Sequence, residues 1–203
     1  MKDKLPAINV TRKVGSESLR IGSSETTHSI VDFWRWSNSD LLENALRGKF
    51  AEFIVACALG LEDGVRTEWD AFDLQTPNGL KIKVKSAAYL QSWPQQRLSS
   101  IKFDVRTTLG WDATTNTSSK TQYRQSDVYV FCLLHHQDKS SVDPLDLSQW
   151  TFYVISTRRL NKSLLTQKTL SLVTLLKLQP RTCGFTDLRN MINIEAAIDT
   201  EVK

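Results

Sequence analysis

The segment that most constrains the fold is a short, almost wholly apolar run at residues 127–134 (DVYVFCLL). An apolar run without regular polar alternation predicts a strand that is buried on both faces of its sheet. A second apolar run at residues 149–156 (QWTFYVIS) predicts another strand. The sheet that holds these strands therefore needs cover on both sides.

A helix is expected earlier in the chain. Apolar side chains recur at helical spacing between residues 40 and 59, which predicts a helix that packs one face on the core. Ser37 or Ser39 is expected to cap its start, and Gly60 to end it.

An acidic hairpin is expected directly after this helix. The extended segment 65–75 is followed by the turn residues Pro77-Asn78-Gly79 and by a second strand at residues 80–87. The connection is tight, so the two strands should pair antiparallel. Further on we expect an extended piece at 100–106, a polar loop at 114–126, and a strand with short helices within 164–178 and 186–194. These elements together predict an α/β sandwich.

The length of 203 residues and the 40% apolar content suit one domain with a real core. Residues 1–28 are polar and are predicted to be a flexible N-terminal tail with at most one short strand, so the domain would span residues 29–203 and begin its packed part at Trp34 and Trp36. No run approaches the ~18 apolar residues of a membrane helix. The start of the chain lacks a secretory apolar run, and the three cysteines are too far apart for a metal pair. A cytoplasmic protein is the expectation.

Charge is distributed unevenly along the chain. Residues 50–80 hold six acidic residues and one basic residue, whereas residues 81–124 hold eight basic and two acidic residues. A metal-dependent enzyme acting on phosphodiesters needs both kinds of segment, carboxylates for the ion and cations for the nucleic-acid backbone. Solvated surface is the alternative explanation of such charge blocks.

Two acidic residues lie where acids are unfavourable. Glu52 is the only polar residue in the helical run FAEFIVACAL, where burial of its carboxylate is costly unless a cation meets it. Asp73 lies among apolar neighbours in an expected strand, although aspartate is a poor strand former. For Glu52 the alternative is a helix edge that reaches water, and for Asp73 it is proximity to the turn.

Three lysines share one face of the second hairpin strand. In the sequence KIKVK, Ile82 and Val84 are expected to point into the core, which places Lys81, Lys83 and Lys85 on the opposite face. Such a row is either a solvated edge or a wall that binds phosphate.

Taken together, these residues resemble the PD-(D/E)XK nuclease superfamily, which has the restriction-endonuclease-like fold. Its motif is a Glu on the first helix, an Asp on one strand, and Glu/Asp-x-Lys on the next. Glu52 and Asp73 match the first two positions, and Lys83-Val84-Lys85 stands where Glu-x-Lys is expected. The following segment SAAYLQSW is similar to the one after the motif lysine in a group of prokaryotic restriction-like nucleases. The resemblance implies a restriction-endonuclease-like α/β sandwich, with a central mixed β-sheet flanked by helices.

The resemblance also implies Mg²⁺-dependent hydrolysis of DNA phosphodiesters in restriction or defence. Asp73, the missing carboxylate and a backbone carbonyl would hold the Mg²⁺ ion, and Glu52 would support it through water. Lys85 would orient the attacking water or stabilise the developing charge. Gln91 would steady the site or contact DNA.

Lysine at position 83 inverts the electrostatics of this site. With Glu there, three carboxylates would face Lys85, whereas Glu52 and Asp73 facing Lys83 and Lys85 form a neutral set. Opposite charges ~4 Å apart interact by about 4 kcal/mol at an effective dielectric of ~20, so an ammonium there both repels Mg²⁺ and takes its place. Glu68 and Asp70 lie an odd number of residues from Asp73 and would face away from it on a regular strand, unless a bulge re-aims one. The chain is therefore predicted to be impaired as a nuclease.

Three hypotheses remain open from the sequence. The first is a DNA endonuclease, active or disabled by Lys83, and the second is a non-catalytic DNA-binding module that retains the nuclease fold. The basic stretch 81–124 would serve either one. The third is a structural subunit that binds neither DNA nor metal. A homodimer is expected by analogy with double-strand cutters of this fold. The expected DNA-binding residues are Lys81, Gln91, Arg97 and Lys102.

Overall fold

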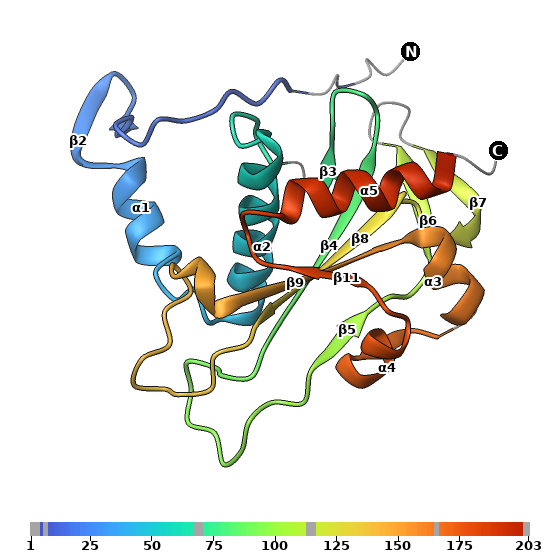
Figure 1. Ribbon diagram of the computed structural model, residues 1–203. Coiled ribbons are helices and arrows are strands. Elements are labelled where there is room, and N and C mark those ends of the chain that lie inside the picture. The colour runs from blue at the N-terminus through green and yellow to red at the C-terminus, as the bar shows by residue number, and fades with distance from the viewer. Residues whose placement is uncertain (1–4, 6–7, 67–70, 113–116, 165–166, 201–203) are drawn as a thin grey trace.

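The computed structural model describes residue 5 and residues 8–66, 71–112, 117–164 and 167–200. A five-stranded mixed sheet lies at its centre, in the order β11-β9-β8-β4-β3 (Figure 1). β4 and β8 are parallel, and the other neighbours in this sheet are antiparallel. The five strands are β3 (Leu74–Gln75), β4 (Lys81–Ala88), β8 (Val128–Leu134), β9 (Trp150–Ser156) and β11 (Arg181–Cys183).

Helices and short strands surround this sheet. The helices are α1 (Ile30–Ser37), α2 (Asn44–Leu59), α3 (Thr157–Leu164), α4 (Leu172–Lys177) and α5 (Leu188–Thr200), with a short 3₁₀ helix at Leu147–Gln149. Three further strand pairs lie outside the central sheet: β1 (Ser18–Ile21) with β2 (Ser24–Ser29), β5 (Lys102–Asp104) with β10 (Thr169–Ser171), and β6 (Thr108–Asp112) with β7 (Thr117–Tyr123). No helix of the described part is long and apolar enough to cross a bilayer.

The central strand β8 confirms the prediction made from the apolar run. All seven of its residues are buried, and their side chains alternate between two separate apolar clusters. One cluster packs under α2 and α5, and the other under α3, α4 and the β5–β10 pair. The α/β class and the mixed central sheet with cover on both faces are therefore confirmed.

α2 begins later than the sequence predicted and ends as expected. Its N-cap is Glu43, whose carboxylate accepts hydrogen bonds from the backbone N–H groups of Ala45 and Leu46 at 3.0 and 2.8 Å. The expected caps, Ser37 and Ser39, instead bond to backbone carbonyls of α1, so that prediction was wrong. Gly60 ends α2 in the left-handed conformation, with φ of 73°.

The β3–β4 hairpin is present but its first strand is short. Only Leu74–Gln75 pairs with β4, where we expected an extended segment from residue 65; residues 67–70, which include Glu68 and Asp70, lie outside the described residues. The turn is closed by the hydrogen bond from Gly79 N–H to the Thr76 carbonyl at 2.8 Å, with φ of 88° at Gly79. Glycine suits this turn because side chains rarely adopt that backbone conformation.

Two predicted irregular segments are strands. Within the polar loop expected at residues 114–126, residues 117–123 form β7, which pairs antiparallel with β6. In the expected flexible tail, where at most one short strand was expected, β1 and β2 form a hairpin that leads into α1. The alternation of apolar and polar residues that predicts a strand was hard to detect in both segments, because their side chains are mostly polar.

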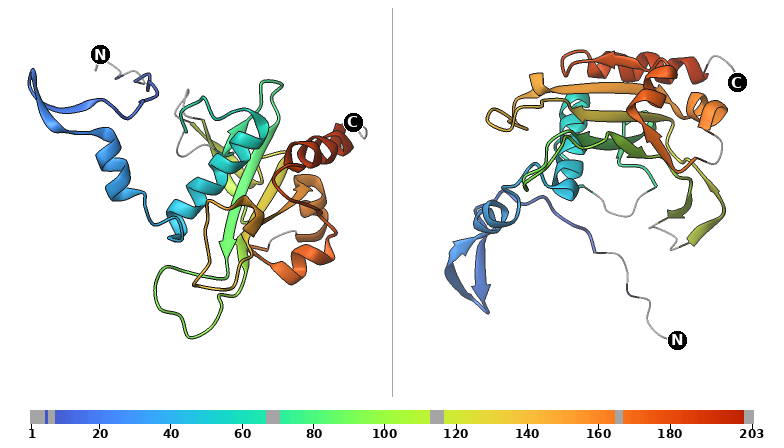
Figure 2. Two further views of the ribbon diagram at one scale, coloured as in Figure 1. Left: turned by 60° about the vertical axis from the view of Figure 1, so that its left-hand side comes forward. Right: turned by 90° about the horizontal axis from the view of Figure 1, so that it is seen from below.

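The N-terminal arm (residues 8–37) also corrects the expectation for its tryptophans. In both views of Figure 2 the arm stands away from the sheet and its covering helices. Trp36 is 84% exposed and Trp34 is 36% exposed, so they do not mark the start of the packed core. The two apolar clusters hold no residue of this arm.

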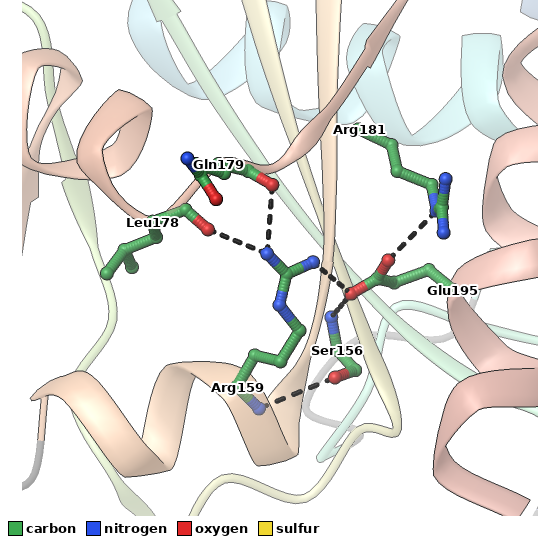
Figure 3. Close-up of polar contacts among 6 residues, drawn as sticks. All are labelled: Ser156, Arg159, Leu178, Gln179, Arg181 and Glu195. Atoms are coloured by element: carbon green, nitrogen blue, oxygen red, sulfur yellow. Dashed lines mark hydrogen bonds and ion pairs between the residues drawn. The ribbon is translucent and has the colours of Figure 1, made fainter.

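A buried carboxylate connects the C-terminal half of the fold. Glu195 of α5 is fully buried and forms ion pairs with Arg159 of α3 at 2.7 Å and with Arg181 of β11 at 3.1 Å (Figure 3). It also accepts a hydrogen bond from the backbone N–H of Ser156 at 3.1 Å. Arg159 in turn donates to the carbonyls of Leu178 and Gln179, just after α4. This cluster holds three helices against the sheet.

Candidate active site

Asp73 and Lys83 form a cross-strand ion pair in the β3–β4 hairpin. The register pairs Leu74 with Ile82, so Asp73 lies opposite Lys83. The Lys83 ammonium lies 2.8 Å from Asp73 Oδ1, and Asp73 Oδ2 accepts a hydrogen bond from the backbone N–H of Val84 at 2.7 Å. Both side chains are largely buried, with 22% of Lys83 and 12% of Asp73 exposed. Asp73 thus has a structural partner for each carboxylate oxygen.

Lys85 lies on the same face of β4 as Lys83. Burial lowers the pKa of Lys85, and the neighbouring Lys83 lowers it further, while Asp73, Asp104 and Glu52 oppose the shift. Among the described residues, these three acids form their ion pairs with other cations: Asp73 with Lys83, Asp104 with Arg106, and Glu52 with Arg66. β3 pairs only with Lys81 and Ile82 of β4, so the further part of β4 has β8 as its sheet neighbour. Lys83 is nevertheless only 22% exposed, and burial lowers the pKa of Lys85, so the interpretation of these two lysines as a solvated sheet edge was wrong.

Glu52 on α2 meets a cation, as burial of its carboxylate requires. Its side chain is only 14% exposed and forms a two-point contact with Arg66, at 2.5 Å from Nε and 3.2 Å from Nη2. The alternative that Glu52 reaches water from a helix edge was therefore wrong. The partner is an arginine of the loop after α2, which the sequence reasoning did not identify.

The two members of the Asp73–Lys83 pair line two different hollows. The acidic hollow, of about 580 Å³, includes Glu52 and Asp73 in its wall, together with Glu62 and Asp63. The cationic hollow, of about 510 Å³, includes Lys83 and Lys85 and continues to the β6–β7 hairpin. The structure thus brings the four predicted catalytic residues into one region, with acids on one side and lysines on the other.

The described residues do not fit a divalent cation at this point. Glu52 and Asp73 are the two carboxylates expected to serve as metal ligands, and each already faces a cation. Across the described ranges, no three His, Cys, Asp or Glu side chains are grouped so as to hold a metal ion. A hard cation such as Mg²⁺ prefers several oxygen ligands, and Lys83 offers a positive charge where one is needed.

The four expected DNA-binding residues lie in different settings. Lys81 places its ammonium 5.2 Å from the ring centroid of Phe72, a cation–π contact. Lys102 and Arg97 are exposed. Gln91 is buried, with 7% exposure, and its side chain bonds to Arg47 and Ser99. The buried position of Gln91 therefore suits a role in holding neighbouring side chains in place better than a contact with DNA.

Several residues of the site were missed by sequence reasoning. Arg47 of α2 is 4% exposed and reaches Ser86 of β4 at 3.2 Å, and burial lowers its pKa. Asp104 ends β5 and Arg106 follows it, and both line the cationic hollow with Arg124. A charged residue with apolar neighbours, as at Arg47, was the available sequence feature. Nothing local indicated that residues 104–106 and 124 would lie beside β4.

Fold and site together describe an α/β protein with an acid and two lysines on one hairpin, next to a helix that carries a second acid. The family model of bacteriophage T4 endonuclease IV matches residues 3–174. The chain therefore belongs to the bacteriophage T4 endonuclease IV family, a family of nucleases. No curated protein matches the chain at a significant level.

Proposed function

We propose that this chain is a DNA endonuclease of the PD-(D/E)XK type whose metal site is disabled by Lys83. Family membership supports the nuclease part of the proposal. The single observation that carries the rest is the 2.8 Å ion pair between Lys83 and Asp73. It occupies the point where the superfamily motif expects a second carboxylate beside the first.

The arrangement of the other motif residues supports the same proposal. Lys85 shares a strand face with Lys83, and the carboxylate of Asp73 reaches that face. Glu52 lines the same hollow as Asp73. A Glu at position 83 would place two carboxylates directly opposite each other across the hairpin, which is a suitable pair for Mg²⁺.

Cleavage of plasmid DNA with Mg²⁺ or Mn²⁺ tests the proposal. The unaltered chain is expected to show little or no cleavage, and Lys83→Glu to increase it by roughly a hundredfold or more, because a metal ion can stabilise transition-state charge by several kcal/mol. The double variant Lys83→Glu/Asp73→Asn is the matched control and should be inactive. Cleavage by the unaltered chain that Asp73→Ala abolishes would contradict the role given to Lys83.

A non-catalytic DNA-binding module is the second candidate function. The observation that favours it is the pairing of both acids, since Glu52 with Arg66 and Asp73 with Lys83 leave no uncompensated carboxylate at either position. Salt-dependent DNA binding, with no cleavage even by Lys83→Glu, would support this candidate over the first.

A further inference from the structure

The cationic hollow has a composition suited to an anion. Four of its lining residues are cations, Lys83, Lys85, Arg106 and Arg124, against one acid, Asp104. The volume of about 510 Å³ lies within the range of small-molecule sites, ~300–1,000 Å³. The hollow therefore concentrates positive potential in a space that a nucleotide-sized group can enter.

The cations of this hollow differ in how many donors remain for a ligand. Arg124 is buried and already donates to the Val105 carbonyl and to Asn161 Oδ1, so it mainly fixes the wall. Arg106 pairs with Asp104 but remains 60% exposed. The two lysines of β4 retain the most donor capacity.

That capacity follows from the hydrogen bonds of each lysine. An ammonium carries three N–H donors. Lys83 gives one to Asp73. In the described part of the chain, the other acids near Lys85, Asp104 and Glu52, are paired with Arg106 and Arg66 rather than with Lys85. The two side chains lie two residues apart on one strand face, so their remaining donors face a common space.

The rest of the wall suits the apolar part of a nucleotide. Leu109 of β6 is about half exposed, and Tyr129 of β8, which is only 4% exposed, lies in the wall of the same hollow. An exposed apolar side chain beside a cluster of cations can cover the base or sugar next to a bound phosphate.

From this geometry we infer that the cationic hollow binds a backbone phosphate of nucleic acid through Lys83 and Lys85, without any divalent cation. This rests on the proposed function only in taking nucleic acid as the ligand class. Lys83, which prevents the metal site, supplies in the same position the positive charge that a metal ion would bring to the phosphate.

Fluorescence anisotropy of a labelled twelve-nucleotide single-stranded DNA in EDTA tests this inference. We expect binding in EDTA with the same affinity as in Mg²⁺. Lys85→Met should weaken it by about tenfold and lower the slope of log K against log salt by about 0.7, the share of one phosphate contact on a single strand. Lys83→Met should have a comparable effect, and inorganic phosphate should compete.

Two matched variants keep the test specific. Lys85→Arg retains the cation and should retain most of the affinity. Lys177→Met removes a lysine from the exposed last turn of α4, outside the hollow, and should leave the affinity nearly unchanged. Thermal unfolding of each variant confirms that it is folded.

The outcomes separate this inference from the proposed function. Binding that requires Mg²⁺, or that Lys85→Met and Lys177→Met affect equally, overturns the phosphate site even if Lys83→Glu cleaves DNA. Binding in EDTA that depends on Lys85 supports it even if Lys83→Glu remains inactive. If inorganic phosphate competes as strongly as unlabelled DNA does, the site binds free phosphate. That outcome would overturn the inference that nucleic acid is its ligand.

Discussion

Lys83 and Lys85 carry the same charge two residues apart, yet their environments differ. Lys83 neutralises the buried carboxylate of Asp73 at 2.8 Å. Lys85 is desolvated beside Lys83 without an ion pair in the described part of the chain, and its pKa is lowered by burial and by that neighbour. One lysine thus stabilises the fold, and the other costs stability that a ligand would recover.

Replacing each lysine by methionine, which keeps much of the side-chain volume, should have opposite effects on stability. Lys83→Met leaves Asp73 buried without its cation and should lower the free energy of unfolding by roughly 1–3 kcal/mol. Lys85→Met removes a desolvated cation and should raise the melting temperature at neutral pH. Thermal and urea unfolding of the two variants measure this, and a loss of equal size in both would contradict it.

The rise in melting temperature expected for Lys85→Met should depend on pH. Because the folded-state pKa of Lys85 is lowered, the folded protein binds fewer protons than the unfolded chain between that pKa and the ordinary lysine value. The stability of the unaltered chain therefore rises with pH through this window. The melting-temperature difference between the variant and the unaltered chain should shrink as the pH rises through it, and a constant difference would argue against desolvation as the cause.

At the scale of elements, α2 determines where Glu52 and Arg47 lie, and its start depends on a carboxylate. The Glu43 carboxylate accepts hydrogen bonds from two backbone N–H groups of the first turn, and these bonds lower the pKa of Glu43. The same negative charge also complements the positive end of the helix dipole. A glutamate therefore acts here as the cap that the sequence assigned to a serine.

Glu43→Ala should lower the melting temperature at neutral pH, because two N–H groups lose their acceptor. The folded-state pKa is lowered, so the stabilisation is present above the unfolded-state pKa and is lost as the pH falls through the folded-state value. The difference in melting temperature should therefore disappear in acid. Glu43→Gln, which retains an acceptor without charge, should show a smaller and pH-independent loss.

At the scale of the whole molecule, Glu195 joins α5 to α3, β9 and β11 through one buried carboxylate. Glu195→Gln keeps the shape but leaves two arginines without their counter-charge, and should cost about 3–5 kcal/mol of unfolding free energy. Urea unfolding measures this loss, and the slope of the unfolding free energy against urea concentration should stay unchanged. Asp63→Asn, which removes an exposed ion pair with Arg12, is the control and should change little. A loss below about 1 kcal/mol for Glu195→Gln would contradict the central role of the cluster.

The sequence by itself determined the features that depend on local periodicity. The apolar run of β8, the helix with Glu52, and the hairpin with Asp73, Lys83 and Lys85 were all predicted because strand and helix spacing fix which side chains share a face. Cytoplasmic location, the DNA contacts and the homodimer stay predictions.

Only the tertiary structure decided the partners of the charged residues. Arg66 reaches Glu52 across 14 positions of the sequence, and Arg159 reaches Glu195 across 36 positions. Arg124 likewise reaches the backbone carbonyl of Val105 across 19 positions. A buried charge needs a counter-charge, but its sequence position does not say which one. The packing of helices and hairpins around the sheet makes that choice, because it brings together residues whose separation along the chain carries no periodic pattern.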